Sequence, residues 1–267
     1  MNSNPIGIFD SGIGGLTVAN AVLKQLPGEQ IIYFGDTAHL PYGDKSSEAI
    51  QHYSTRISDF LLEQNCKVIL IACNTASAAA FDAVKSHVGE RVPVLNVIDP
   101  VVESITADKS LTKVGIIGTK GTIKSGVYEQ KLKISRPDLE VVPLATALLA
   151  SMIEAGFYNN SISQAIINSY LAYPDFSNIQ AMVLACTHYP LIEKEVSSFF
   201  NHRIKIFEST VLVAENIKRL LEEKDLLSNR NKGSHRFFVS DFTDSFEQTT
   251  KVFFQEKIHL EHAPVRD

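Results

Sequence analysis

Two of the three cysteines in this chain stand where a short apolar run gives way to small polar residues. Cys73 is followed by an Asn-Thr pair, and Cys186 is followed by a Thr-His pair. A thiol has a pKa of about 8.5, which neighbouring groups can move toward the working pH, so it can both accept and donate a proton. Two thiols facing each other could remove a proton from one side of a ligand and return one to the other side. The pattern therefore favours inversion of a stereocentre.

Other interpretations of the same residues stay open. Cys186 and His188 could be the nucleophile and base of a hydrolase, although side chains two positions apart are not expected to meet well, and Cys73 would then have no role. Zinc could be held by Cys73, Cys186 and His188, but no ligand-spacing pattern supports this. A two-lobed binding protein without catalysis fits the fold class but leaves the two thiols unexplained. Cys66 precedes an apolar run without polar neighbours, so we expect it to be an ordinary core residue.

Short polar stretches also follow other strand-like runs, and ligands of parallel α/β sheets bind at the carboxyl ends of the strands. These stretches are 10–12, 35–37, Asp99 and 118–119. The glycine-rich segment 11–15 could hold an anion on its backbone N–H groups, and a substrate carboxylate is the favoured anion. The segment is neither a dinucleotide fingerprint, because Thr17 replaces the third glycine, nor a P-loop.

The elements that must position these residues alternate along the chain. Strand-like runs rich in β-branched and aromatic residues occupy 6–9, 30–34, 67–71, 92–97, 114–117, 140–142, 181–185, 204–207 and 236–239. Amphipathic periodicity predicts helices over 46–62, 161–171 and 211–221. Strands that are apolar on both faces, separated by helices, predict an α/β fold with mostly parallel sheets.

The chain also repeats itself. Segment 6–12 resembles 114–121, and segment 70–75 resembles 184–188. The first pair of landmarks, Asp10 and Cys73, is 63 positions apart, and the second, Thr119 and Cys186, is 67 apart. We therefore predict two similar doubly wound α/β domains related by a pseudo-twofold axis, with the active site in the cleft between them. The pattern alone puts the boundary near 97–100.

Composition narrows the class of partner. The 267 residues include 25 basic and 30 acidic side chains, a net charge of −5, without a basic stripe, so nucleic acid and anionic membranes are not expected partners. Three cysteines without a CxxC pair exclude a full disulfide framework and a zinc ribbon. His259 and His262 have ligand spacing but fall in an expected exposed tail, so no metal site is predicted. The amino terminus does not read as a signal peptide, and we expect a cytoplasmic protein with free thiols.

Several ordered motifs resemble those of the bacterial glutamate racemases, within the cofactor-independent aspartate/glutamate racemase superfamily. The matching stretches are 8–16, 35–43, 72–76, 118–122 with Ser125 and Tyr128, 153–156 and 185–191. The resemblance implies racemisation of L-glutamate to D-glutamate for peptidoglycan, with glutamate as the small-molecule partner and without a cofactor. It places 1–97 with 209–267 in a discontinuous first domain and 98–208 in the second. Homodimers are common in the family, but no face of this chain identifies an interface.

The resemblance also implies roles for individual residues. Cys73 would take the α-proton from D-glutamate and Cys186 from L-glutamate, with Asp10 beside the first thiol and Glu154 and His188 beside the second. Substrate-binding roles fall on Ser11, Tyr42, Gly43, Asn74, Thr75 and Thr187, with Thr119 and Thr122 as cap residues at the edge of the site.

Two positions depart from the family pattern. Ala145-Thr146 stands near a customary Cys-Pro pair, and Glu208-Ser209 replaces a customary Asp-Ser pair. Neither departure touches the thiols, but both fall where the cleft edge and the crossover between domains are expected.

Overall fold

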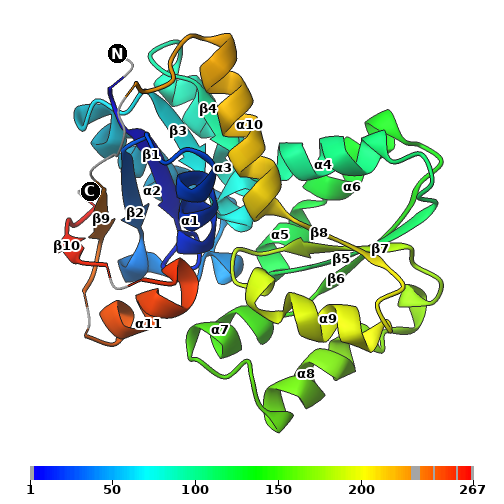
Figure 1. Cartoon of the computed structure of the whole chain (residues 1–267). Coiled ribbons are helices and arrows are strands. Elements are labelled where there is room, and N and C mark those ends of the chain that lie inside the picture. Colours follow the sequence, from blue (N-terminus) through cyan, green and yellow to red (C-terminus); the bar gives the residue numbers. More distant parts are fainter. Residues whose placement is uncertain (1–2, 230–234, 243, 257, 266–267) are drawn as a thin grey trace.

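The strands form two parallel sheets, as a computed structural model of the chain shows for residues 3–229, 235–242, 244–256 and 258–265. The first sheet contains β1 (Ile6–Asp10), β2 (Ile31–Gly35), β3 (Val68–Ile71), β4 (Val94–Asn96), β9 (Arg236–Val239) and β10 (Leu260–His262), in the order β10-β9-β2-β1-β3-β4. The second contains β5 (Lys113–Gly118), β6 (Glu140–Ala145), β7 (Ala181–Ala185) and β8 (Lys205–Glu208), in the order β6-β5-β7-β8. Figure 1 shows the two sheets in separate halves of the molecule.

The internal repeat predicted from the sequence is present in the topology. The order β2-β1-β3-β4 in the first sheet matches β6-β5-β7-β8 in the second, strand for strand along the chain. β1 therefore corresponds to β5, and β3 corresponds to β7. Cys73 follows shortly after β3, and Cys186 directly follows β7, so the two thiols occupy equivalent places in the two halves.

Helices cover both faces of each sheet. In the first half these are α1 (Leu16–Gln25), α2 (Ser47–Glu63), α3 (Asn74–Val88), α10 (Ser209–Glu223) and α11 (Asp244–Phe254). In the second half they are α4 (Ile98–Ala107), α5 (Lys120–Ser125), α6 (Val127–Ser135), α7 (Leu149–Glu154), α8 (Ser161–Leu171) and α9 (Glu193–Phe199). Short 3₁₀ turns complete the connections: η1 (Thr37–His39), η2 (Tyr42–Asp44), η3 (Pro174–Phe176) and η4 (Tyr189–Ile192).

The predicted helices form for the expected reasons. In α2 the buried residues Ile50, Ile57 and Leu61 lie on one face, and the Ser46 side chain caps the first turn by accepting the N–H of Ala49. The strands alternate their side chains between two layers. Ile6 and Ile8 of β1 pack under α1, whereas Phe9 packs under α2 and α3.

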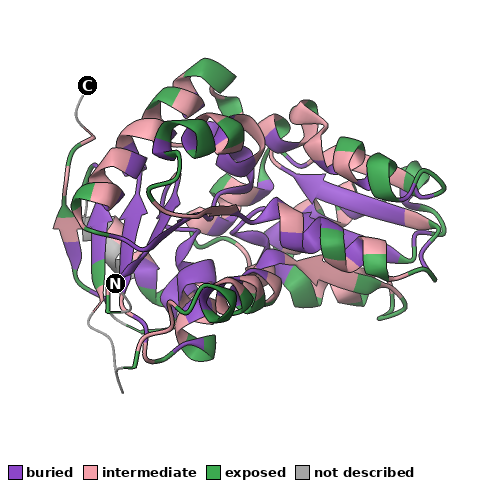
Figure 2. Cartoon of the chain, turned by 90° about the horizontal axis from the view of Figure 1, so that it is seen from above, coloured by how far each residue is buried: buried purple, intermediate pink, exposed green. Residues whose placement is uncertain are grey.

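One core cluster joins the two halves. It runs from Ile8 and Leu16 in the first half to Leu184 and Ile153 in the second, and it includes Phe253 of α11. Buried residues continue through the middle of both halves in Figure 2, whereas exposed residues gather on the outer helices. The ends of the strands in the two halves are therefore held against each other by packed apolar side chains.

One expectation about the carboxyl-terminal segment is only partly right. His259 and His262 are exposed as expected, but the segment is not a tail, because residues 260–262 form β10, which pairs with β9 at the edge of the first sheet. Leu260 is buried, and this apolar anchor together with the ladder to β9 holds the segment in place. Within the described ranges, every helix is too short or too polar to span a bilayer.

Candidate active site

A small cavity of about 40 Å³ lies where the carboxyl ends of both sheets meet. Its walls come from the segments after β1, β2 and β3 in the first half and after β5, β6 and β7 in the second. The lining residues are Ser11, Gly12, Leu40, Pro41, Tyr42, Gly43, Cys73, Asn74, Thr75, Thr119, Ala150, Ser151, Glu154, Cys186, Thr187 and His188. Both thiols and most of the predicted polar side chains therefore share one enclosure.

Cys73 lies at the amino terminus of α3. Its Sγ accepts the backbone N–H of Ala76 at 3.4 Å and lies 3.6 Å from Ser11 Oγ. Burial, reinforced by the Asp10 carboxylate, raises the pKa of Cys73 to about 12, although the contacts with Ala76 and Ser11 oppose that rise. At neutral pH Cys73 is therefore a protonated thiol, able to donate.

Asp10 is fully buried behind the cavity wall. Its Oδ1 accepts the backbone N–H of Gly12 at 3.0 Å, and its Oδ2 accepts the hydroxyl of Thr187 from the other half at 3.4 Å. Burial raises the pKa of Asp10, and the nearby His188 opposes this shift. The glycine-rich segment was expected to offer its N–H groups to a substrate carboxylate, but the N–H of Gly12 instead holds Asp10.

Cys186 lies in contact with a histidine. Its Sγ is 3.5 Å from His188 Nδ1, and His188 Nε2 is 3.4 Å from Glu154 Oε2. Burial pulls the pKa of His188 down, but Cys186 and Glu154 outweigh it and leave that pKa well above its usual value. An imidazolium next to Cys186 Sγ stabilises negative charge on that sulfur. The two thiols therefore differ in their surroundings: Cys73 lies near the Asp10 carboxylate, whereas Cys186 Sγ lies beside the His188 imidazole.

Hydroxyl groups connect the two halves beside the cavity. Thr75 Oγ1 lies 2.8 Å from Thr119 Oγ1 and 3.1 Å from Thr122 Oγ1, and the last two are 3.0 Å apart. On the neighbouring position, Asn74 Oδ1 accepts the hydroxyl of Tyr128 at 2.8 Å. Asn74 Nδ2 is buried and makes no hydrogen bond within the described residues, so a residue that lines the cavity keeps an unused donor.

Tyr42 and Gly43 form the wall opposite Thr119. The hydroxyl of Tyr42 donates to the buried Asp36 at 2.6 Å, and the same carboxylate accepts the hydroxyl of Ser240 at 2.7 Å. A Cβ added at Gly43 would lie 3.0 Å from Thr119 Cβ, so glycine lets this segment approach the second half closely.

Comparisons with known proteins agree with this geometry. The sequence profile of the Asp/Glu/Hydantoin racemase family matches residues 14–217. The chain is 37% identical to the glutamate racemase of Geobacter metallireducens over 254 residues, which cover 95% of this chain and 93% of that protein.

The present chain belongs to the Asp/Glu/Hydantoin racemase family.

Two solved structures of family members superpose closely. The glutamate racemase of Francisella tularensis, in complex with D-glutamate, has a TM-score of 0.93 and 37% identity, with 99% of each chain covered. The glutamate racemase of Thermus thermophilus, in complex with β-chloro-D-alanine, has a TM-score of 0.88 and 32% identity, with 98% of each chain covered. Family membership makes the present chain an isomerase of the racemase type.

The cavity gathers all but two of the predicted site residues. Asp10 and Thr122 lie behind its wall, where Asp10 contacts Gly12 and Thr187 and where Thr122 bonds to Thr75 and Thr119. Asp10 is linked to the cavity lining through the backbone of Gly12 and the side chain of Thr187, and Thr122 through the side chains of Thr75 and Thr119.

Sequence reasoning missed part of the lining. Leu40 and Pro41 fall inside the motif 35–43. Their side chains are apolar and carry no reactive group, so the sequence did not indicate that they line the cavity. Ala150 and Ser151 precede Glu154 by one helical turn, and this spacing was the signal that could have found them.

The structure bears on two of the alternatives. Cys186 and His188 do meet, contrary to the expectation for residues two apart, because the chain turns sharply after β7, with the N–H of Tyr189 bonded to the carbonyl oxygen of Cys186. Among the residues that the structure describes, no three His, Cys, Asp or Glu side chains are grouped to hold a metal ion. Cys66 is buried in the core as expected.

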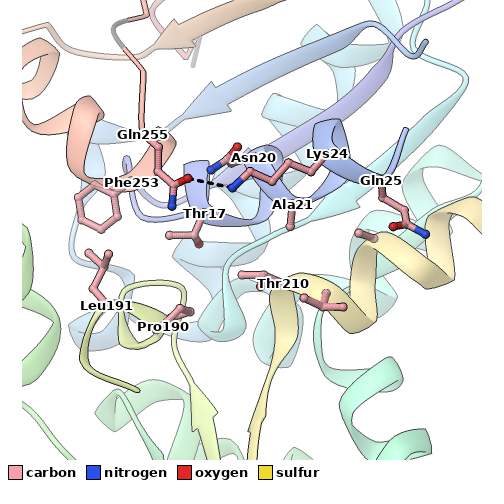
Figure 3. A pocket seen from close by; sticks show the side chains of 12 residues that line it. Thr17, Asn20, Ala21, Lys24, Gln25, Pro190, Leu191, Thr210, Phe253 and Gln255 are labelled. Carbon is pink, nitrogen blue, oxygen red and sulfur yellow. Dashed lines mark hydrogen bonds between the residues drawn. The ribbon is translucent and has the colours of Figure 1, made fainter. Parts of the chain in front are cut away.

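A second cavity, of about 350 Å³, lies on the far side of α1 and contains none of the predicted residues (Figure 3). Lys24 and Gln255 bridge it with a hydrogen bond of 2.8 Å. Two of its lining side chains touch the active site: the ring of Phe253 packs edge-on against His188, and Thr17 Oγ1 donates to the carbonyl oxygen of Thr187. The two cavities are thus separated by a single layer of side chains.

Proposed function

We propose that this protein interconverts L-glutamate and D-glutamate by proton transfer between two thiols. The observation that carries the proposal is that Cys73 and Cys186, at equivalent strand ends of a repeated fold, line the same small cavity. Relatives of known name and similar length support glutamate as the substrate, and one of them holds D-glutamate in its structure.

The chemistry follows from the difference between the thiols. From L-glutamate, the Cys186 thiolate, stabilised by the His188 imidazolium, takes the α-proton and becomes a thiol. The electron pair left on Cα then takes a proton from Cys73 on the opposite face, which leaves a Cys73 thiolate and D-glutamate. The reverse reaction exchanges these roles.

Stabilisation of the carbanion must come from fixed dipoles, because an α-proton is far less acidic than a thiol. Asn74 Nδ2 is a buried donor without a partner among the described residues, and the Thr75 and Thr119 side chains line the cavity with it, which suits them to hold carboxylate oxygens as charge spreads onto the α-carboxylate. We propose that no cofactor or metal takes part.

The domain limits and the cellular role are also proposals. We assign 1–97 with 209–267 to the first domain and 98–208 to the second. The product D-glutamate is a building block of peptidoglycan, so we place the enzyme in cell wall biogenesis, which maintains cell shape, and in the cytoplasm. Three free thiols suit that reducing compartment. Assembly into a homodimer remains a prediction.

Circular dichroism of L-glutamate incubated with the protein in deuterium oxide tests the activity. The expected result is decay of the signal to zero with deuterium at Cα. The same experiment with L-aspartate should leave the signal unchanged, and a faster decay with aspartate would reassign the substrate.

The Cys73→Ala and Cys186→Ala variants test the two-thiol scheme. Each should lose racemisation while keeping its fold by far-ultraviolet circular dichroism, and full activity in either would sink the scheme. If the native protein bound glutamate without ever inverting it, a non-catalytic binding protein would be the right description. A purified sample should also show no pyridoxal-type absorbance and no metal dependence.

A further inference from the structure

Three strand ends of the second half are joined by a chain of buried hydroxyls next to Cys186. Thr146 Oγ1 donates to the carbonyl oxygen of Gly118 at 3.1 Å, and the Tyr189 hydroxyl lies 2.7 Å from Thr146 Oγ1. Because the Thr146 proton is directed at Gly118, Tyr189 is the donor in the second bond. Tyr189 and Thr146 have exposures of 0% and 1%, so water does not compete for these bonds.

Each of the three residues joined by these hydrogen bonds lies next to a segment that surrounds Cys186. Gly118 ends β5 and precedes Thr119, which lines the cavity. Thr146 follows β6, and its carbonyl oxygen accepts the N–H of Leu149, the first residue of α7, which ends at Glu154. Tyr189 begins η4, and its own N–H closes the turn that holds Cys186 and His188.

The contacts among Cys186, His188 and Glu154, which form the second half-site, are sensitive to small displacements. The 3.4 Å ion pair between His188 Nε2 and Glu154 Oε2 is not a hydrogen bond, and the contact between Cys186 Sγ and His188 Nδ1 is 3.5 Å long. α7 carries Glu154, and His188 directly precedes η4. Among the described residues, the segment just before α7 is tied to this turn by no hydrogen bonds other than those of Thr146 with Tyr189. A shift of a few tenths of an ångström between the two segments would change the distance from Glu154 to His188, whose ring contacts Cys186 Sγ.

We propose that Tyr189 and Thr146 are positioning residues that act selectively on the Cys186 half of the reaction. Their hydroxyl pair sets the distance between the segment carrying Glu154 and the turn carrying Cys186 and His188. The inference rests on the proposed function, in which Cys186 removes the α-proton of L-glutamate. Neither side chain lines the cavity.

The first half offers a matched comparison. The hydroxyl of Tyr33, also fully buried, donates to the carbonyl oxygen of Gly12 at 2.7 Å and so fixes the segment beside Asp10 and Cys73. Tyr33 and Tyr189 are thus two buried phenols: one bonds to the segment that follows β1, and the other bonds to the segment that follows β6.

Primary deuterium isotope effects, measured from each enantiomer separately, test the selectivity. L-[2-²H]glutamate reports on proton removal by Cys186, and D-[2-²H]glutamate reports on removal by Cys73. In Tyr189→Phe we expect kcat to fall roughly tenfold with KM within about twofold, and the isotope effect to rise from the L side only. In Tyr33→Phe the isotope effect should rise from the D side only. Tyr173→Phe, distant from the cavity, should match the native protein.

A double-mutant cycle tests the pairing itself. Thr146→Val should reproduce the effect of Tyr189→Phe, the double variant should be no worse than either single one, and Thr146→Ser, which keeps the hydroxyl, should restore native values. Thr146→Val also serves if Tyr189→Phe does not fold. Additive losses, equal isotope effects from both enantiomers, or a native Tyr189→Phe would each overturn the proposal.

Cys186→Ala separates this proposal from the one on which it rests. If Cys186→Ala stays fully active, the two-thiol scheme is wrong and the selectivity loses its basis. If Cys186→Ala is inactive while Tyr189→Phe shows no change confined to the L side, the scheme stands and the positioning role is wrong.

Discussion

His188 lies against the backbone of Gly14, although the two residues belong to different halves of the molecule. A Cβ built on Gly14 would stand 2.4 Å from His188 Cε1 and 2.8 Å from Thr187 Oγ1. The imidazole therefore occupies the space that any side chain at position 14 would need. The absence of a side chain at Gly14 lets the second thiol's histidine approach Asp10.

The Gly14→Ala substitution should displace His188 from Cys186. We expect kcat/KM for glutamate to fall roughly 100-fold, because misplacement of a proton-transfer group by about 1 Å has consequences of this size. Steady-state kinetics check the loss, and thermal unfolding shows whether the fold survives. Gly12→Ala is the comparison: its added carbon would meet only ordinary contacts of 3.5 Å, so its loss should be much smaller. Equal losses in both variants would contradict this account of Gly14.

The Asn74→Asp substitution tests carboxylate binding at the free amide nitrogen. The new carboxylate still accepts the Tyr128 hydroxyl but replaces the Nδ2 donor with a negative charge facing the substrate carboxylate. We expect KM to rise roughly 10- to 100-fold, with a smaller change in kcat. Tyr128→Phe, which removes the contact at the other end of the amide, should raise KM less. An unchanged KM in Asn74→Asp would show that Nδ2 does not contact the substrate.

The Cys66 thiol should make the free energy of unfolding fall as the pH rises above 9. Burial raises its pKa from 9.0 to about 12, so its contribution is fully present below pH 9 and is lost as pH rises toward 12. In that window the native protein should lose about 1.4 kcal/mol of unfolding free energy per pH unit to this group. Cys66→Ala should be less stable at pH 7, because it leaves a small cavity, but its stability should fall less steeply above pH 9. Urea unfolding at several pH values measures both slopes, and parallel slopes would refute the assignment. Racemisation at pH 7 should be unaffected.

A buried ion pair far from the cavity should control stability without touching catalysis. Lys67 Nζ lies 2.6 Å from Glu29 Oε2, both side chains are 2% exposed, and Lys67 also donates to the carbonyl oxygen of Leu226. Lys67→Met leaves the Glu29 charge without its partner and should cost about 3–5 kcal/mol of unfolding free energy. Adding Glu29→Leu should recover most of that loss, and kcat of the folded fraction should stay native in both proteins. If Lys67→Met were as stable as the native protein, the prediction would be contradicted.

Much of the fold was predictable because its signals are local. The apolar runs around Ile8, Leu70, Ile116 and Val183 are strands that bury both faces, and the repeat between them anticipated the shared strand order. The same logic located Cys73 and Cys186 at equivalent strand ends. β10 escaped prediction because a three-residue edge strand carries almost no periodic signal.

What the sequence could not predict lies where the two halves meet. That Asp10 accepts the hydroxyl of Thr187, and that Thr122 stands behind Thr75 rather than in the cavity, depends on how the halves pack. The departure at Ala145-Thr146 proved informative only in three dimensions, where Thr146 receives the hydroxyl of Tyr189. Contacts between segments more than forty positions apart leave no mark on local pattern.

The chain passes between the two sheets twice, once after β4 and once after β8. Two domains joined by two crossover segments can rotate easily about the axis that passes through both segments. Rotations about other axes are resisted because they would stretch one of the segments. The cavity of about 40 Å³ lies between the two halves, so this rotation is the movement that would widen it. Rotation about a single axis would return each thiol to the same position every time the halves close. The faces of Cα that the two thiols approach would then be set by the position of that axis.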